Sequence, residues 1–240
     1  MDTNIIIFTA LLPVAILLYY IYRKDKNSPE PTKVLIKAFM LGILSIPLSF
    51  CISIPFGVIG LYNFHPTNIL DSIRISFFGA AIPEEVAKFF ILWLVLRKNP
   101  YFDEKMDGIV YAVCVSLGFA AVENIMYLFS NAGRFLTVGV TRAIFSVPGH
   151  FCFGILMGYY YSLAKFYPLS PKRNKALILI APILGHGIYD SILYSISVTT
   201  IISAILMIVF LVFCIIMWRY ASKRIQEHLQ RDLCSQESCK

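Results

Sequence analysis

Charged residues are scarce in this 240-residue sequence, at 15% of the chain, whereas hydrophobic residues make up 58%. The mean hydropathy is +0.72. A soluble domain carries about 25% charged residues, because its surface must interact with water. So small a charged fraction excludes a soluble globular fold and indicates a chain whose main solvent is lipid. The formal net charge of +7 must therefore be interpreted from the position of its charges along the chain.

Sequence signatures of several other protein classes are missing. The chain has no HExxH motif, no low-complexity tract and no polar stretch long enough for a separate soluble domain. Its six cysteines are divided between apolar runs and the C-terminal segment, a pattern that supports neither a disulfide framework nor a cysteine-based zinc site. Residues 1–240 are therefore expected to form a single polytopic membrane domain.

Apolar runs of about 20 residues recur from end to end, and each is long enough to cross about 30 Å of hydrocarbon. Seven are expected to be transmembrane helices: 4–22, 34–56, 75–96, 108–129, 142–164, 176–194 and 199–218. The first run resembles a signal peptide in length, but it lacks a basic leading segment and a small-residue cleavage site. The sequence thus predicts an all-α integral membrane protein, a bundle of about seven transmembrane helices.

The connections between these runs differ in their content of lysine and arginine. Most basic residues fall in alternate connections and the C-terminal segment: five in Arg23–Lys37, three in Arg97–Lys105, four in Lys165–Lys175 and five from Arg219 onward. The intervening connections hold only Arg74, Arg134 and Arg142. Because basic loops remain in the cytoplasm, this asymmetry predicts an external N-terminus and a cytoplasmic C-terminus, with residues 219–240 as a basic tail. Contact with anionic lipid is a secondary role for the same loops.

Two adjacent carboxylates, Glu84 and Glu85, lie inside the run 75–96, and Lys88 follows one turn later. A carboxylate at mid-membrane costs about 2.5–3.5 kcal/mol on insertion scales, so such residues generally have a function. Lys88 is spaced to reach either carboxylate. The positive charge of Lys88 favours the ionised form of the two carboxylates, whereas burial favours their protonated form. These opposing effects suit a general base that activates water. The alternative is a Glu–Lys pair that only neutralises itself, which leaves the second glutamate unexplained.

Four more ionisable side chains belong to later runs: Glu123, His150, His186 and Asp190. Helix rise places Glu84, His150 and His186 roughly 12–14 Å below the outer surface and Glu123 roughly 9 Å below it. Asp190 follows His186 by four residues, close enough to hold its imidazole tautomer. Taken singly, each histidine is as compatible with a packing role as with a functional one. Glu123 is likewise compatible with a helix–helix hydrogen bond that it makes together with Asn124.

This common depth separates three classes of membrane protein. A proton- or ion-coupled transporter also uses buried carboxylates and histidines, but its relay should extend through the full membrane thickness. A non-catalytic scaffold would not need such costly groups.

Prolines accompany the polar residues, at Pro83, Pro148 and Pro182, and irregular backbone at membrane depth is tolerated where it lines a cavity. Gly154 and Gly158 form a GxxxG pattern that favours close helix contact beside His150. A reaction site is therefore favoured.

Four short motifs then carry a resemblance to a known family: PEEVAKF at 83–89, GFAAVEN at 118–124, PGH at 148–150 and GHG at 185–187 followed by Asp190. In this combination the chain resembles the PrsW family of intramembrane endopeptidases, related to the CAAX prenyl endopeptidase and bacteriocin-processing superfamily. Lys88 and Asp190 stand where the CAAX branch usually has arginine and asparagine, which favours the PrsW branch. The resemblance covers roughly residues 75–195, the expected catalytic core.

The resemblance implies a protease of the prokaryotic plasma membrane that acts on a membrane-anchored protein and binds no nucleic acid. Its best-known members make the first, extracytoplasmic-side cut in anti-sigma factors. The superfamily's paired glutamates correspond to Glu84 and Glu85, and its two histidine elements to His150 and His186. With Glu123, these form the expected catalytic set, and Lys88 and Asp190 are expected to support it.

Two mechanisms remain open at this point. In the first, Glu84 activates water, Glu85 tunes it, and His150 and His186 bind water and stabilise the oxyanion. In the second, His150, His186 and either Glu84 or Glu85 hold Zn²⁺, and the other glutamate is the base. The sequence favours the metal-free form slightly, so no cofactor is firmly implied and zinc is the alternative.

Overall fold

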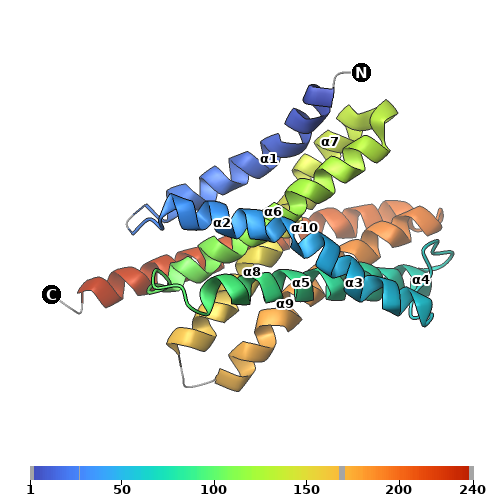
Figure 1. The fold of residues 1–240 in the computed structure, drawn as a ribbon. Helices are drawn as coiled ribbons and strands as arrows, with labels where there is room; N and C mark the ends of the chain where they lie inside the picture. The colour runs from blue at the N-terminus through green and yellow to red at the C-terminus, as the bar shows by residue number, and fades with distance from the viewer. Residues whose placement is uncertain (1–2, 27, 168–170, 238–240) are drawn as a thin grey trace.

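The computed structural model describes residues 3–26, 28–167 and 171–237, and the regular elements within these ranges are all helical (Figure 1). The first half contains α1 (Thr3–Lys24), α2 (Thr32–Ile43), α3 (Ser45–Val58), α4 (Ile69–Arg74), the π-helix η1 (Ile75–Ala81) and α5 (Ile82–Leu96). The second half contains α6 (Lys105–Ser130), the 3₁₀ turn η2 (Ala132–Arg134), α7 (Phe135–Ile144), α8 (Ser146–Phe166), α9 (Pro171–Val198) and α10 (Ser203–Glu237).

Six helical segments of the described residues are long and apolar enough to cross a membrane: Thr3–Lys24, Thr32–Val58, Lys105–Ser130, Ala132–Phe166, Lys172–Val198 and Ser203–Cys234. Each corresponds to one of the expected spans. The remaining expected span, 75–96, is helical along its whole length but is divided into η1 and the 15-residue α5. The structure therefore confirms an all-α integral membrane protein.

Two other expected spans are each divided between two α-helices. The second span breaks at Leu44, between α2 and α3, and the fifth breaks at Phe145, between α7 and α8. In both places a proline follows three residues later, Pro47 and Pro148. Because proline has no backbone N–H, it cannot complete the preceding turn, but it is tolerated in the first turn of the next helix. Both breaks thus fall just before a proline in the first turn of the next helix.

Helix α6 lies in the middle of the bundle (Figure 1). In its 18-residue apolar stretch, 78% of the residues are buried. Glycines bring its neighbours very close. A Cβ atom added to Gly158 of α8 would lie 2.2 Å from the carbonyl oxygen of Gly108, and one added to Gly154 would lie 2.9 Å from the Cβ of Ser116. The GxxxG pattern of α8 therefore packs backbone against backbone on α6, as the sequence predicted.

Helix α10 lies at the periphery, because only 11% of the residues in its 18-residue apolar stretch are buried. Its outer face carries large aliphatic side chains, among them Ile205, Ile208 and Ile216, which are 57–63% exposed. In water such a continuous apolar surface would be a liability, whereas in a bilayer it faces lipid tails. The exposed side chains of α10 are what a membrane-facing helix requires.

The basic connections and the end of α10 gather at one end of the bundle. The Lys105 ammonium pairs with Asp232 of α10 at 3.1 Å, and Lys165 at the end of α8 donates to the carbonyl of Phe102. Glu30, between α1 and α2, accepts a hydrogen bond from a tyrosine in the second turn of α6. The start of α1 lies at the opposite end (Figure 1). This is the arrangement that the alternating charge of the connections predicts.

Candidate active site

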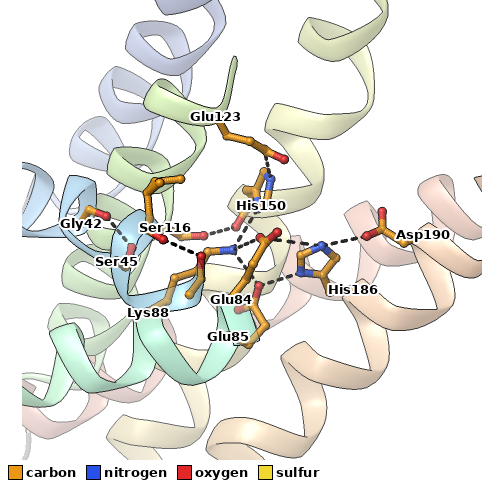
Figure 2. Close-up of polar contacts among 12 residues, drawn as sticks. Gly42, Ser45, Glu84, Glu85, Lys88, Ser116, Glu123, His150, His186 and Asp190 are labelled. Atoms are coloured by element: carbon orange, nitrogen blue, oxygen red, sulfur yellow. Dashed lines mark hydrogen bonds and ion pairs between the residues drawn. The ribbon is translucent and has the colours of Figure 1, made fainter. Parts of the chain in front are cut away.

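Side chains from four helices meet in one polar cluster inside the bundle (Figure 2). The polar cluster comprises Glu84, Glu85 and Lys88 of α5, Glu123 of α6, His150 of α8, and His186 and Asp190 of α9. These are the residues that the sequence singled out, and the structure brings all of them together. The helices that carry them are separated by loops, so their meeting is a property of the tertiary fold.

The π-helix η1 leads directly into the glutamate pair. Pro83 stands in the first turn of α5 and has no backbone N–H to donate to the preceding turn. The carbonyl oxygen of Gly79 instead accepts a hydrogen bond from the Ser53 hydroxyl of α3, at 2.8 Å. Wide π turns are common at functional sites, and here the turn is stabilised by a side chain of a neighbouring helix. It directs Glu84 and Glu85 toward the centre of the bundle.

Lys88 is the central cation of the polar cluster and is only 1% exposed. Its ammonium nitrogen lies 2.8 Å from Glu85 Oε1 and 3.3 Å from Glu84 Oε2. It also lies 3.1 Å from His150 Nδ1 and 4.1 Å from the ring centre of Phe119. A buried ammonium of this kind is tolerated only when its donors and its charge are matched. The structure confirms that Lys88 reaches both glutamates.

His186 is held on both ring nitrogens by carboxylates. Its Nδ1 lies 2.9 Å from Glu85 Oε1, and its Nε2 lies 3.3 Å from Asp190 Oδ2 and 4.0 Å from Glu84 Oε2. The ring stacks on Phe153 with the centroids 4.8 Å apart. Because a carboxylate only accepts hydrogen bonds, these contacts are best satisfied by an imidazolium with both nitrogens protonated. Asp190 thus orients His186, as its spacing predicted.

His150 joins the α5 residues to α6. Its Nε2 lies 2.8 Å from Glu123 Oε2, while its Nδ1 faces the Lys88 ammonium. The backbone carbonyl of His150 accepts a hydrogen bond from Ser116 at 2.7 Å, which fixes α8 against α6 at this level. Asn124, the neighbour of Glu123, also bonds to another helix, because its amide nitrogen donates to the Ala10 carbonyl of α1 at 2.7 Å. The helix–helix hydrogen bonds expected as the alternative at Glu123 and Asn124 are therefore present, alongside the contact of Glu123 with His150.

Arg142 of α7 is a member of the site that sequence reasoning missed. The charge pattern of the sequence places it with the external connections, but in the structure it is only 8% exposed. It donates to Glu123 Oε2 at 2.7 Å and to Asn124 Oδ1 at 2.6 Å, and its guanidinium lies 4.0 Å from the Tyr127 ring centre. The sequence signal was its position at the start of an apolar run, on the same side of the membrane as Glu123. One arginine thus neutralises Glu123 and fixes its rotamer.

A cavity of about 350 Å³ opens beside the polar cluster. Its lining is formed by Ala80, Glu84, Glu123, Tyr127, Arg142, Ser146, His150, Phe153, His186, Tyr189, Asp190, Leu193, Tyr194 and Ser197. The side chains of Glu84, Glu123 and Asp190 are 15–19% exposed, whereas Glu85 is fully buried. Of the two adjacent glutamates, Glu84 is the one that faces the cavity.

These features supply the parts that hydrolysis of a peptide bond within a membrane requires. A carboxylate beside a polar cavity can take a proton from water, and cationic or N–H groups nearby can stabilise an oxyanion. The helical bundle keeps bulk water and lipid away from them. The fold and the site together define the class of intramembrane endopeptidases.

Comparison with known proteins identifies the family. The model described as PrsW family intramembrane metalloprotease matches residues 30–217. Proteins named Protease PrsW are similar to this chain: one from Oceanobacillus iheyensis is 38% identical over 93% of the chain and 97% of its own length, and one from Clostridioides difficile is 35% identical over 92% and 90%. A third, from Bacillus subtilis, is 36% identical over 80% and 84%. The chain belongs to the PrsW family.

Family membership establishes the class of the protein and its place in the cell. The protein is an intramembrane endopeptidase and a multi-pass bacterial membrane protein. Nothing in the comparisons favours the transporter alternative. No solved structure matches the chain.

The family description names a metal, so the polar cluster must be tested as a metal site. Glu84, Glu85 and His150 each offer one ligand atom within 4.8 Å of the other two, and carboxylates and imidazole are zinc ligands. Lys88, however, contacts these same three side chains at 3.3, 2.8 and 3.1 Å. The ammonium lies where the metal would lie and supplies the charge that the carboxylates require. His186 has both nitrogens engaged with carboxylates. This arrangement does not fit a metal ion.

Proposed function

We propose that Glu84 is the general base of the endopeptidase and that it activates a water molecule in the cavity. The observation that carries this proposal is the contrast within the glutamate pair. Glu84 lines the cavity and is 15% exposed, whereas Glu85 is fully buried between Lys88 and His186. Only a carboxylate in reach of the cavity can take a proton from water bound there.

The reaction balances with this one base. Glu84 accepts a proton from water while the water oxygen bonds to the carbonyl carbon of the scissile peptide. The resulting tetrahedral species carries an oxyanion. Its carbon–nitrogen bond then breaks, and Glu84 returns the proton to the departing nitrogen, so that an acid and an amine leave the site. None of these steps uses a metal ion.

His150 and His186 are the residues that stabilise the oxyanion in this mechanism. His186 Nε2 lies 4.0 Å from Glu84 Oε2, which places an N–H group on the same side of the cavity as the base. His150 also lines the cavity, and its Nε2 is oriented by Glu123 at 2.8 Å. N–H groups fixed beforehand act without reorganisation as the charge develops. In this mechanism the Nε2–H groups of His150 and His186, which face Glu123 and Asp190 in the free protein, also reach the water and the oxyanion when substrate occupies the cavity, and the two carboxylates hold the rings in place.

Glu85 and Lys88 are positioning residues in the same scheme. Glu85 Oε1 accepts from both Lys88 and His186, at 2.8 and 2.9 Å, so it links the cation to the imidazolium. Lys88 then balances the negative charge of the glutamate pair at 2.8 and 3.3 Å. Removing either partner of such a buried pair leaves an unbalanced charge and costs about 3–5 kcal/mol.

The proposed substrate is a membrane-anchored protein cut near its extracytoplasmic side, and an anti-sigma factor is the class that the family resemblance implies. With the C-terminus in the cytoplasm, Glu84, His150 and His186 lie in the outer half of the bilayer, roughly 12–14 Å below its surface. A helical peptide bond is hydrogen-bonded and shielded. The substrate must therefore unwind locally, and Gly or Pro near the cut should help.

Cleavage of a single-span reporter by the purified protein tests this proposal. Glu84→Gln should abolish cleavage while the thermal unfolding temperature stays close to that of the wild type, since glutamine keeps the shape of the side chain. Glu227→Gln is the matched control, because Glu227 pairs with Arg224 on α10 and does not line the cavity. Mass spectrometry should place the cut in the outer half of the reporter span. Full activity of Glu84→Gln would remove the base from this mechanism.

A further inference from the structure

A second cavity adjoins the one that Glu84 lines, hereafter the catalytic cavity. This apolar cavity has a volume of about 410 Å³ and lies among α7, α8, α9 and α10. Its lining is almost entirely apolar, and Arg219 is the only charged side chain among the described residues that form it. Phe153 of α8 and Tyr189 of α9 belong to the linings of both cavities. The two cavities therefore share a wall.

The apolar cavity runs from the lipid-facing surface to this wall. On its outer side are Ile144, Ile215 and Trp218, which are 38–58% exposed and would contact lipid tails in a bilayer. On its inner side are Phe153 and Tyr189, which are only 2% and 6% exposed. A larger cavity of about 540 Å³ near the basic connections shares no lining residue with the catalytic cavity. The apolar cavity is thus a route from lipid to the edge of the active site.

The shared wall touches the catalytic side chains directly. The ring of Phe153 stacks on His186 with the centroids 4.8 Å apart, and Tyr189 packs edge-on against Phe153 at 6.1 Å. Gly149, the residue before His150, also lines the apolar cavity, and a Cβ atom added there would lie 3.7 Å from both aromatic rings. The space in front of the wall is therefore open. A side chain that reaches the wall would contact the ring that packs on His186.

We propose that the apolar cavity is a substrate subsite, which takes a large apolar side chain of the substrate's transmembrane segment next to the scissile bond. This inference rests on the proposed cleavage at Glu84 and adds the part of the substrate that is recognised. The neighbours of a scissile bond within a membrane span are mostly apolar, and the catalytic cavity is lined with polar groups. The adjoining cavity gives one such side chain an apolar environment. Its volume lies within the range of ligand pockets, about 300–1,000 Å³.

The subsite predicts selection by size and polarity at one position of the substrate. An apolar pocket discriminates between side chains that differ by one methylene by about tenfold to 200-fold. A single-span reporter with Leu at this position should therefore have a kcat/KM at least about tenfold higher than one with Ala or Asp. Leu and Ala both favour a helix, so this comparison separates the subsite from the ease of local unwinding.

Disulfide cross-linking tests where the substrate lies. Cys214 is a free, half-buried cysteine on the α10 side of the cavity. It is kept as the sole cysteine of the full chain in detergent, the others being replaced by alanine, and Glu84→Gln is added to prevent cleavage. The reporter carries one cysteine at successive positions of its span and is oxidised together with this variant. We expect cross-links at one or two positions beside the cut. A chain that retains only Cys51, which is exposed on α3 and does not line the cavity, is the control and should give none.

Filling the cavity tests the selection itself. Cys214→Trp adds bulk from the peripheral helix α10, so kcat/KM for the Leu reporter should fall at least about tenfold, while the Ala reporter should be cleaved nearly as by the wild type. A general loss of stability would lower both. Ile208→Trp, on the exposed face of α10, is the matched control and should change neither.

The outcomes separate this subsite from the choice of base. The cross-link requires no cleavage, so activity of Glu84→Gln would contradict the proposed base and leave the cross-linking result to stand alone. Absence of a cross-link between Cys214 and every reporter position would overturn the subsite. An equal fall in cleavage of both reporters by Cys214→Trp would also overturn it. Unchanged cleavage of both would assign the cavity to a lipid tail in place of the substrate.

Discussion

The Nδ1 atom of His150 lies 3.1 Å from the ammonium nitrogen of Lys88, at the centre of the polar cluster. An ammonium group only donates, so Nδ1 must accept, and the ring proton belongs on Nε2, which faces Glu123 at 2.8 Å. The Lys88 contact therefore fixes the tautomer of His150 from across the interface between α5 and α8. One lysine thus couples the glutamate pair to a histidine of the cavity.

Replacing this lysine should disable the site. Lys88→Met keeps most of the side-chain volume but leaves Glu85 buried without its cation, so we expect cleavage of the reporter to be lost. Stability should fall by about 3–5 kcal/mol, the cost of removing one partner of a buried ion pair. Reporter cleavage and thermal unfolding measure the two effects. Lys98→Met, at an exposed position after α5, is the control and should change neither.

Metal removal should leave the wild-type protein active. Because the Lys88 ammonium lies among Glu84, Glu85 and His150, the purified enzyme is expected to hold less than one zinc per chain by elemental analysis and to cleave its reporter after dialysis against EDTA. In Lys88→Met the same three donors become available, so this variant should gain zinc binding. Stoichiometric zinc in the wild type together with loss of activity on chelation would contradict the metal-free mechanism.

Arg142 should be as necessary as the residues that the sequence indicated. Arg142→Lys cannot reach Glu123 and Asn124 together, because these contacts use two different nitrogens of the guanidinium. A lost hydrogen bond to a charged group is worth about 1.5–3 kcal/mol, so kcat should fall about tenfold to a hundredfold. Arg134→Lys, at an exposed position of η2, is the matched control. Equal activity of both variants would exclude a role for Arg142.

Packing between α6 and α8 gives a prediction about stability. Gly158→Ala would place a methyl group 2.2 Å from the Gly108 carbonyl oxygen, where backbone must move to accept it. Overpacking of this kind costs about 1–3 kcal/mol, and the unfolding temperature in detergent should fall. Gly133→Ala has nothing within 4 Å of the added atom and should behave like the wild type. An unchanged unfolding temperature for Gly158→Ala would show that the two helices separate easily.

The orientation of the chain can be measured directly. In a background without native cysteines, Asn63→Cys or Asn131→Cys should react with an impermeant thiol reagent added outside the cell, and a reporter fused after Lys240 should be cytoplasmic. Tyr101→Cys, in the basic connection after α5, should react only after permeabilisation. The opposite labelling pattern would invert the topology and move the polar cluster to the cytoplasmic half.

Much of the fold follows from local composition. Apolar runs of about 20 residues define the crossings because every backbone group must be satisfied within its own segment in lipid. The bends at Leu44 and Phe145 and the π turn of η1 are less evident, because proline is also frequent in straight membrane helices. The position of such an irregular turn depends on which group donates a hydrogen bond to the carbonyl oxygen that proline leaves without a partner. At Gly79 this donor is the Ser53 hydroxyl of another helix.

Composition and charge pattern were enough to predict the lipid solvent of this protein, its helical class and the residues of its polar cluster, since a charge inside an apolar run is costly wherever the run packs. Which glutamate faces the cavity became evident from the packed helices alone, because Glu84 and Glu85 are adjacent and chemically identical. The same packing placed Arg142 on Glu123 and Lys88 among three possible metal ligands. These contacts join helices far apart in the chain, and their geometry depends on side-chain packing that no local pattern encodes.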